Sequence, residues 1–391
     1  MANVSSSNGL EKRPKLRFPG FDEPWQSTLL SSVFAKNTKK NTDGQITNVI
    51  CNSAKQGLIP QREYFDKDIA NSDNTNGYYI IEENDFVYNP RKSTDAPYGP
   101  ISSYKYAEAG IVSPLYLCFR AKKEINPAFF EWYFRSSAWH RYVYMSGDSG
   151  ARHDRVSIKD DTFFAMPINL PSAHEQEHIA SFLEGIDQRI EIQRALVENL
   201  KKYKRGAVTH ILSDKSNEFA SEATWTERTL AELCCEFRSG RNISASLIHE
   251  TGDYPVYGGN GIRGYCDQYS HDGEYVVVGR QGALCGNVRL IQGKNYLSEH
   301  AIAVRANEEN ETNFLLYLLD YMKLGQYSDQ GAQPGLAVNK LLRLKCTVPD
   351  KKTQSKIASF LMRFDSQIST QERMLTLLTN QRRAFLQQLF I

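Results

Sequence analysis

Two short motifs in the sequence could belong to catalytic sites for nucleotide chemistry. Residues 259–264 read Gly-Asn-Gly-Ile-Arg-Gly, the glycine spacing of a dinucleotide-binding loop. Such a loop must follow a strand and open a helix, whereas the residues after Gly264 are typical of turns and strands. Asn89-Pro90 begins like the Asn-Pro-Pro-aromatic motif of adenine methyltransferases, but Arg and Lys occupy the next two positions. We therefore predict neither site, and interpret residues 259–264 as a tight loop that exposes backbone donors.

Residue types that bind metals or cleave phosphodiesters are present, but at the wrong spacing. Pro349-Asp350 could begin a nuclease carboxylate motif, yet no Glu-x-Lys follows. P-loop, Gly-x-Ser-x-Gly and His-Glu-x-x-His motifs are absent from the sequence. We therefore predict a chain without catalytic residues and without a bound metal or cofactor. The Cys and His residues that lack zinc-ligand spacing are Cys266, His271, Cys285 and His300.

An internal repeat indicates how the chain is organised, and hence which elements would position any functional residue. The segment Ile179–Leu183 reads Ile-Ala-Ser-Phe-Leu and recurs, 178 positions later, as Ile357–Leu361. A weaker repeat precedes each copy, since Trp25 and Leu30 match Trp225 and Leu230. The pattern predicts the order globular unit, helix, globular unit, helix. Further identities at the offset of 178 pair Pro171, Gln176, Asp187 and Arg205 with Pro349, Gln354, Asp365 and Arg383.

The repeated segments have the seven-residue period of a coiled coil. Apolar positions alternate at spacings of four and three, and neither segment contains a Pro. We predict an antiparallel pair, which would bring the C-terminus back to the first globular unit. The alternative is two ordinary amphipathic helices, each packed on its own globular unit. The predicted seam consists of Ile179, Leu183, Ile186, Ile190, Gln193, Val197 and Leu200 in the first copy, and Ile357, Leu361, Phe364, Ile368, Gln371, Leu375 and Leu378 in the second.

Polar residues in and beside this seam have two interpretations each. Gln193 and Gln371 hold equivalent seam positions, where an antiparallel pair would bring them together and fix the register. They could instead lie exposed in a loosely packed seam. A basic run near the end of the first helix is either a solvated helix face or a contact with a partner or with DNA. This run is Lys201, Lys202, Lys204 and Arg205.

Each globular unit mixes strand and helix patterns, which predicts an α+β fold. In the first unit, strand-like runs occupy residues 78–81 and 111–119, and Asn126-Pro127 has the residue types of a helix start. In the second, strand-like runs occupy 275–278 and 301–304, followed by a helix at about 312–321. The predicted boundaries are a disordered start at 1–14, globular units at 15–171 and 225–349, helices at 172–213 and 350–391, and a linker at 214–224.

Composition limits the class of protein and its compartment. The 391 residues carry a formal net charge of +2, far less than a histone-like nucleic-acid binder carries. Any DNA contact must therefore use local basic clusters, or a partner must supply charge. Seven scattered cysteines form no Cys-x-x-Cys pair, and the sequence has neither an apolar signal core nor an apolar run of about 18 residues. We expect a reduced, cytoplasmic protein with free and mostly buried thiols.

With the repeat and the heptads established, the chain resembles the specificity subunits of type I restriction–modification enzymes along nearly its whole length. The opening residues 14–21, Pro-Lys-Leu-Arg-Phe-Pro-Gly-Phe, followed by Trp25, look like the usual start of these subunits. Residues 171–183 and 349–361 look like the starts of their two spacer helices. Segments that look like motifs of a common target-recognition-domain type are 254–262, 279–282 and 333–336.

The resemblance implies a non-catalytic subunit that reads DNA for a methyltransferase. In this family each target recognition domain reads one half of a bipartite site, and the two helices set the unread spacer. Two methyltransferase subunits dock along the coil and methylate adenine with adenosylmethionine, and motor-nuclease subunits join for cleavage in phage defence. Adenosylmethionine is therefore expected on the methyltransferase partner.

Base readout uses side chains that form paired hydrogen bonds with base edges, and phosphate contacts use basic and small polar groups. We expect Arg280 and Arg152 to contribute most, because glycine-flanked loops would present them freely. Each candidate has the alternative of being an ordinary solvated residue. The first-unit candidates are Arg91, Lys92, Ser93, Tyr104, Lys105, Arg152, His153 and Arg155, and the second-unit candidates are Tyr257, Asn260, Arg263, Arg280, Gln281 and Gln333.

Two other classes of function remain compatible with the sequence. The first is an enzyme, such as a fused methyltransferase or nuclease, against which the missing motifs argue. The second is a DNA-binding subunit of a related defence system that has a different catalytic partner. A neighbouring methyltransferase gene would favour the type I interpretation.

Overall fold

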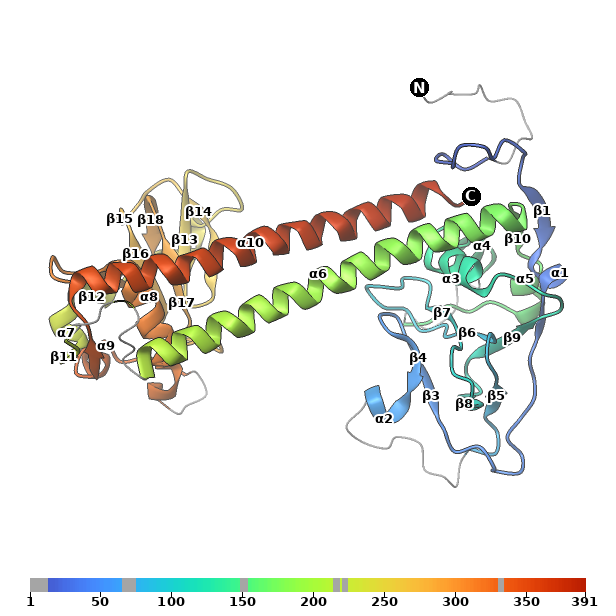
Figure 1. Ribbon diagram of the computed structural model, residues 1–391, viewed down its shortest axis with the longest axis horizontal. Coiled ribbons are helices and arrows are strands. Elements are labelled where there is room, and N and C mark those ends of the chain that lie inside the picture. Colours follow the sequence, from blue (N-terminus) through green and yellow to red (C-terminus); the bar gives the residue numbers. More distant parts are fainter. Residues whose placement is uncertain (1–12, 65–74, 148–153, 214–218, 220–223, 330–333) are drawn as a thin grey trace. The chain divides into compact units, whose positions relative to one another are not determined.

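The computed structural model describes residues 13–64, 75–147, 154–213, 219, 224–329 and 334–391. The chain forms two compact units (Figure 1). The first unit comprises Met1–Ile192 with Leu375–Ile391, and the second comprises Gln193–Met374. The boundary between the units falls inside two long helices, α6 (Ala173–Ser213) and α10 (Lys351–Gln388). These are the two helices that the heptad pattern predicts.

The first unit is a mixed α+β structure built mainly from antiparallel strands. Its central sheet has the order β2-β9-β6-β7, and the strands β1 and β10 pair separately. The strands are β1 (Gln26–Leu29), β2 (Phe34–Lys36), β3 (Ile50–Ser53), β4 (Gly57–Pro60), β5 (Tyr79–Ile81), β6 (Phe86–Tyr88), β7 (Ile101–Ser103), β8 (Gly110–Val112), β9 (Leu117–Ala121) and β10 (Pro167–Leu170). The helices are α1 (Leu30–Val33), α2 (Gln61–Tyr64), α3 (Pro127–Arg135), α4 (His140–Ser146) and α5 (Asp160–Phe164).

The second unit has a central sheet in the order β12-β19-β16-β17 and a second sheet in the order β14-β13-β18-β15. Its strands are β11 (Thr226–Thr229), β12 (Cys234–Ser239), β13 (Tyr254–Gly258), β14 (Gly261–Cys266), β15 (His271–Asp272), β16 (Tyr275–Gly279), β17 (Val288–Ile291), β18 (Lys294–Leu297), β19 (Ala301–Ala306) and β20 (Lys345–Val348). Its helices are α7 (Leu230–Leu233), η3 (Ala245–Leu247), α8 (Thr312–Tyr321), η4 (Leu324–Tyr327) and α9 (Val338–Leu341).

The two units share one topology, which confirms the predicted internal repeat. The pair β1–β10 corresponds to β11–β20, and the central sheets correspond strand for strand. The hairpin β3–β4 corresponds to β13–β14, because β13 runs parallel to β18 and Val49, just before β3, forms a parallel bridge with Ile111 of β8. The helix α3 likewise corresponds to α8. The repeat thus extends over the whole globular unit, beyond the segments where sequence identity is visible.

Local sequence signals account for several of these elements. The Asn126 side chain accepts a hydrogen bond from the backbone N–H of Phe129, and Pro127 occupies the first turn of α3, as the cap pattern predicts. The predicted strand at 111–119 is wrong in one respect, because it splits into β8 and β9. A turn closed by a hydrogen bond from Tyr116 N–H to Ser113 O separates them, and Pro114 lies in that turn.

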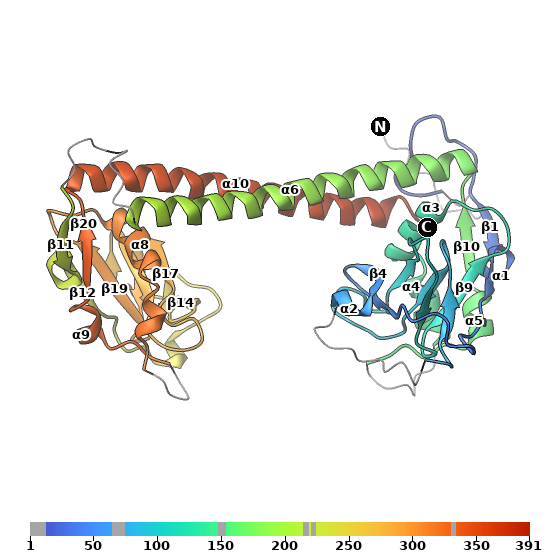
Figure 2. The same ribbon diagram turned by 60° about the horizontal axis from the view of Figure 1, so that its bottom comes forward.

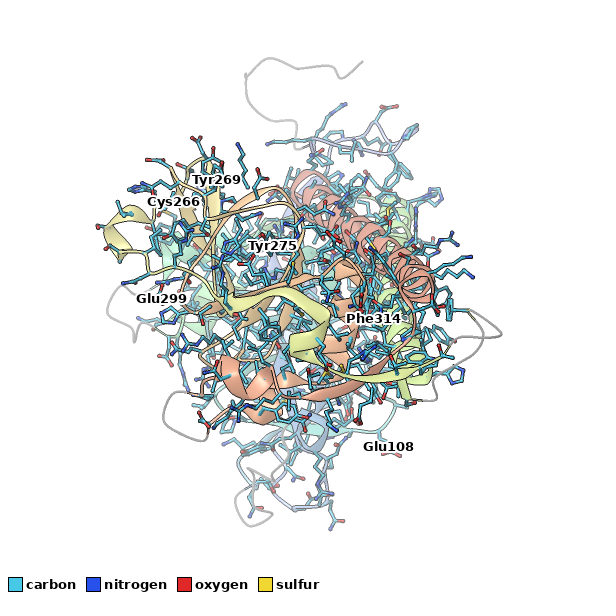
Figure 3. All side chains as sticks on the ribbon, turned by 90° about the vertical axis from the view of Figure 1, so that its left-hand side faces the viewer. Glu108, Cys266, Tyr269, Tyr275, Glu299 and Phe314 are labelled. Carbon is cyan, nitrogen blue, oxygen red and sulfur yellow. The ribbon has the colours of Figure 1, made fainter. Side chains whose placement is uncertain are left out.

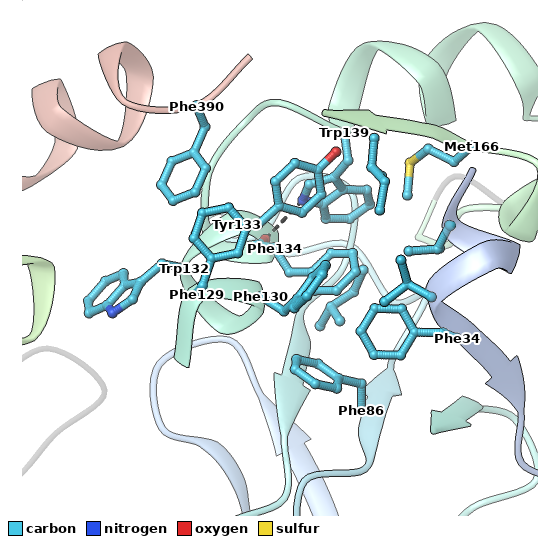
Figure 4. Packing of buried hydrophobic residues seen from close by; sticks show 14 of the residues in the cluster. Phe34, Phe86, Phe129, Phe130, Trp132, Tyr133, Phe134, Trp139, Met166 and Phe390 are labelled. Atoms are coloured by element: carbon cyan, nitrogen blue, oxygen red, sulfur yellow. Dashed lines mark hydrogen bonds between the residues drawn. The ribbon is translucent and has the colours of Figure 1, made fainter. Parts of the chain in front are cut away.

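Each unit completes its apolar core with the end of the helix that starts at the other unit. In the first unit, Phe390 packs against Phe129 and Tyr133 of α3 (Figure 4), and Leu389 belongs to the same core. In the second unit, Ile211 and Leu212 at the end of α6 join the core beside β16 and α8. The prediction that the C-terminus returns to the first unit is confirmed. Helix starts also pack on their own units, since Ile179 and Leu183 belong to the first core.

Within each unit, α6 and α10 lie side by side and antiparallel (Figures 1 and 2). In the first unit Phe182 packs edge-on against Phe385, and Asp187 accepts a hydrogen bond from Arg382. All fourteen predicted seam residues are buried or half-buried, so the coiled-coil prediction is confirmed. Fully buried members include Ile179, Leu183, Ile357 and Leu361.

The two seam glutamines bond to each other rather than to solvent. Gln193 donates from Nε2 to Gln371 Oε1 at 2.8 Å and to the Gln371 backbone carbonyl at 3.0 Å. Two ion pairs occupy positions that the repeat makes equivalent, Asp187 with Arg382 and Asp365 with Lys204. These polar side chains meet their partners only when the helices are aligned in this register. The contacts therefore help to specify the register of the coil.

Candidate nucleic-acid interface

A groove of about 810 Å³ in the first unit collects the basic residues of two loops. We call it the basic groove. Arg91, Lys92 and Ser93 line it from the loop that follows β6, and Arg155 lines it from the segment before α5. Arg91, Lys92 and Ser93 are exposed, and Arg155 is half-buried. Four of the predicted first-unit residues therefore share one concave surface.

Backbone pairing holds these two loops together. Arg91 and Arg155 form an antiparallel bridge, Lys92 N–H donates to Asp154 O at 2.9 Å, and Val156 N–H donates to Pro90 O at 2.8 Å. Since the backbone groups satisfy each other, the charged side chains are left to face the groove. No ion pair joins Arg91, Lys92 or Arg155 to a carboxylate within the described part of the chain. Their charge is therefore available for a phosphate or a base edge.

The third wall of the basic groove is the β3–β4 hairpin, which the sequence analysis missed. Lys55 in its turn lines the groove and lies 3.6 Å from Asp95. Asn52 anchors the hairpin by donating to Val87 O at 2.7 Å and accepting from Ser102 Oγ at 2.9 Å. The run Ala54-Lys55-Gln56 between two short strands could have marked Lys55 as a turn residue. Tyr116 also lines the groove, and burial raises the pKa of its phenol, so that this side chain is neutral.

Two predicted first-unit residues lie away from the basic groove. The prediction for Tyr104 is wrong, because the ring is 0% exposed in a core cluster and its hydroxyl donates to Glu108 O at 2.8 Å. Lys105 is exposed but lies 3.1 Å from Glu131, in a different groove beside α3. Arg152 and His153 of the first unit, and Gln333 of the second, lie outside the described residues.

The second unit presents its predicted residues on a hairpin. Gly259-Asn260 connects β13 to β14, so the dinucleotide-like glycine motif is a two-residue turn followed by a strand, as predicted. Asn260 and Arg263 are exposed on this hairpin. Tyr257 is half-buried against a small core cluster. Beyond the end of β14, Tyr269 lies toward the outer edge of the unit, whereas Tyr275 and Phe314 lie nearer its middle (Figure 3).

Glycines bring the second-unit loops into direct backbone contact. A Cβ on Gly259 would stand 2.3 Å from Gln281 O, and one on Gly286 would stand 2.1 Å from Gly325 N. Hydrogen bonds then join the loops, from Gly282 N–H to Pro334 O at 3.1 Å and from Leu336 N–H to Arg280 O at 2.9 Å. The hairpin, the loop after β16 and the segment before α9 consequently form one continuous surface.

Arg280 is held within this surface rather than presented freely, which corrects the expectation for it. Its Nη1 donates to Glu299 O at 3.2 Å and its Nε lies 3.4 Å from Leu336 O. Gln281 is also engaged, since its Oε1 bonds to His300 Nδ1. Arg289, which the sequence analysis missed, is exposed beside the hairpin with its Nη1 2.8 Å from where a Gly261 Cβ would stand. Asn260, Arg263 and Arg289 are thus accessible polar groups of this face.

The recognition loops occupy equivalent places in the two units. In the first, the loop after β6 pairs with the segment before α5, through Arg91 and Arg155. In the second, the loop after β16 pairs with the segment before α9, through Gln281 and Gly335. Because β6 and β16 are matching strands, the same loop pair is assembled twice with different side chains.

The thiols differ in part from the expectation. The seven cysteines are all free, but only Cys118 and Cys266 are buried, four are half-buried and Cys235 is exposed. Burial raises the pKa of Cys118, Cys234 and Cys346 to about 12, which keeps these thiols protonated and unreactive. Within the described ranges no three His, Cys, Asp or Glu side chains gather as a metal-binding group. None of the helices described here is apolar enough over a sufficient length to cross a membrane.

Comparison with known families agrees with this duplicated arrangement. Residues 23–202 and residues 222–380 each match the type I restriction modification DNA specificity domain. The chain belongs to this family. The two matches take in both globular units and most of both long helices, so each copy of the family domain contains one unit with its helix.

Similar proteins carry the same description. The EcoprrI type I restriction enzyme specificity subunit of Escherichia coli is 43% identical over 160 residues, which are 40% of this chain and 39% of that protein. A putative type I specificity subunit of Haemophilus influenzae is 26% identical over 144 residues, 36% of this chain and 37% of that protein. The matched stretches thus span about two fifths of these curated relatives. The crystal structure of a type I system S subunit from M. genitalium has a TM-score of 0.63 at 17% identity, covering 97% of this chain and 99% of that one, which shows a shared fold.

Proposed function

We propose that this chain is the DNA-sequence-specificity subunit of a type I restriction–modification enzyme in the cytoplasm. Each globular unit is a target recognition domain that reads one half of a bipartite site in double-stranded DNA. The coiled coil sets the length of the unread spacer. The observation that carries the proposal is the paired recognition loop built twice on matching strands, once around Arg91 and Arg155 and once around Gln281 and Gly335.

The roles within each face follow from accessibility and chemistry. Arg91, Lys92 and Arg155 can contact phosphates or guanines, because each has unshared N–H donors turned to a groove. In the second unit Asn260 can pair with adenine and Arg263 with guanine, since both are exposed on a hairpin that a major groove admits. Arg280 and Gln281 are positioning residues that hold the loops on which the readers stand.

The coil is proposed to dock two methyltransferase subunits. Outside the seam, its helices expose large apolar side chains, among them Leu196 at 41% and Tyr203 at 69% on α6, and Met374 at 45% and Leu377 at 57% on α10. Exposed apolar groups on a helical pair are typical of a surface that another helix covers. Lys201 of the basic run is committed to Glu198 and Glu372, and Lys204 to Asp365, so these two serve the coil. Motor-nuclease subunits would join the same assembly for cleavage.

The chemistry is assigned to the partner. With a net charge of +2 the isolated chain has little general attraction for DNA, so the methyltransferase subunits must add contacts. They would also hold adenosylmethionine and receive the flipped adenine. We expect weak DNA binding by the chain alone, and an increase of orders of magnitude when the methyltransferase is added.

The test is methylome sequencing of cells that express the wild-type chain or single variants with the methyltransferase. Arg263→Ala should relax or abolish one half of the methylated motif, with a loss of about 1–3 kcal/mol if it pairs with a guanine. Arg91→Ala should affect the other half only. Identical motifs in the wild type and both variants would refute the assignment of these faces.

A further inference from the structure

The first unit has a second groove, about 840 Å³ in volume, which shares no lining residue with the basic groove. It lies between α3 and the part of α6 from Glu184 to Ile192, and we call it the acidic groove. The α6 wall is about 12 Å long, from eight steps of 1.5 Å, which is a little over two helical turns. The wall is therefore as long as two turns of another helix.

The lining of the acidic groove has a large excess of negative charge. Five carboxylates and two cations line it, and both cations are already engaged. Lys105 lies 3.1 Å from Glu131, and Arg135 lies 2.6 Å from Glu131 and 3.5 Å from Asp187. Glu184 and Glu83 are exposed and form no ion pair within the described ranges. A DNA phosphate is repelled here, so this groove does not belong to the DNA-reading face.

Apolar surface accompanies this charge. Ile192 closes one end of the groove and is 70% exposed, so most of this apolar side chain is not covered by the protein. Pro127 and Ala128 of α3 line the groove and are half-buried. A ligand that matches both features must be cationic on one side and apolar on the other, which describes a basic amphipathic helix.

The second unit has the equivalent groove, about 540 Å³ in volume, between α8 and α10. We call it the neutral groove, since Lys204 and Arg289 balance Asp320 and Asp365. At the repeat offset of 178, Asp187 corresponds to Asp365, but Glu184 corresponds to Met362. One matched position thus carries a carboxylate in one groove and an apolar side chain in the other. The other carboxylates that line only the acidic groove are Glu83, Glu131 and Glu191.

We propose that the acidic groove docks a Lys- and Arg-rich amphipathic helix of a protein partner, and that the neutral groove does not select for such a helix. The proposal rests on the proposed function only in that the partner would be the methyltransferase subunit, because the charge and shape of the groove do not depend on that assignment. The two repeated units would then bind the partner helix unequally. Binding to the first unit would depend more strongly on salt concentration.

The test uses a labelled peptide of about 18 residues, with Leu along one helical face and Lys along the other, titrated with the full chain. Fluorescence anisotropy measures its affinity at low and moderate salt. We expect the peptide to bind and to weaken with salt, and Glu184→Met to weaken binding about two- to fivefold at low salt, the range for losing one exposed charge pair. Met362→Glu should leave the affinity of the acidic groove unchanged and add at most a weak second site, because it introduces a single carboxylate into the neutral groove.

Matched controls keep the outcome decisive. Glu309→Gln removes an exposed carboxylate outside both grooves and should leave peptide binding unchanged. A peptide with Glu in place of Lys should not bind, and circular dichroism verifies that each variant is folded. The proposal is overturned if the wild type does not bind, or if Glu184→Met and Glu309→Gln bind the peptide equally. It is also overturned if the chain alone is a dimer that Glu184→Met dissociates, since the occupant is then a second copy. The methylation motif of each variant is a separate readout, so failure here does not involve the DNA-reading role.

Discussion

Neutralising the basic groove should remove a defined part of the salt dependence of DNA binding. The change is the triple variant Arg91→Ala, Lys92→Ala and Arg155→Ala, in which the backbone bridge between the two loops remains. Each phosphate contact contributes a slope of about −0.9 to log K against log salt, through release of counterions. If all three side chains contact phosphates, the slope should become shallower by about 2.7.

This slope corresponds to a measurable difference. Between about 50 and 200 mM salt, a fourfold change, each contact accounts for a roughly 3.5-fold loss of affinity, and three contacts for about 40-fold. The assay is fluorescence anisotropy of a labelled duplex with the chain and its methyltransferase, at several salt concentrations. Lys123→Ala is the control, because Lys123 is exposed in the same unit and does not line the groove. An unchanged slope in the triple variant would show that DNA does not enter the basic groove.

Three further predictions concern the coil and the stability of the first unit. Inserting four residues between Leu200 and Lys201 adds about 6 Å and about 400° to α6, so sequencing of methylated DNA should find one or two extra unread bases in the motif; unchanged spacing would argue against a ruler. Gln193→Leu leaves the Gln371 amide without its partner and should cost about 1–2 kcal/mol, whereas the double Leu variant should recover the wild-type unfolding midpoint; equal losses in both would exclude coupling. Burial lowers the pKa of His140 from 6.5 to about 4, so the folded state resists the proton and stability should fall by on the order of 2 kcal/mol as pH decreases from about 6.5 to about 4; urea titrations of His140→Gln should lack that decline.

Periodicity made the coil predictable from sequence, whereas burial in the loops was not predictable. Seam positions such as Ile179 and Leu361 are specified by residues three and four positions away, so the pattern is local and can be followed over seven successive seam positions in each helix. The end of α10 could be placed near the first unit because an antiparallel pair allows no other position. The globular topology was predicted only as mixed α+β, since strand order depends on contacts between residues far apart in sequence.

The errors at the candidate site have the same cause. Tyr104 sits next to Lys105 at the end of β7, and one residue decides whether the ring enters the core or faces solvent. Arg280 lies between Gly279 and Gly282, yet carbonyls of Glu299 and Leu336, 19 and 56 residues away, hold its guanidinium. Arg91, Lys92 and Arg155 could be named from sequence as loop cations. Their meeting in one groove with Lys55 depends on a hairpin that only the fold brings there.

The glycine contacts between the second-unit loops have a consequence for how new DNA specificities arise. Gly259 and Gly286 approach neighbouring backbone so closely that any side chain would separate the loops. Asn260 and Arg263, on the same surface, are exposed. Substitution of the two glycines should therefore disrupt the loops, whereas substitution of the exposed neighbours should leave the fold intact. If these side chains read DNA, as proposed, a lineage can exchange them one at a time and acquire a different target while the scaffold that presents them stays folded.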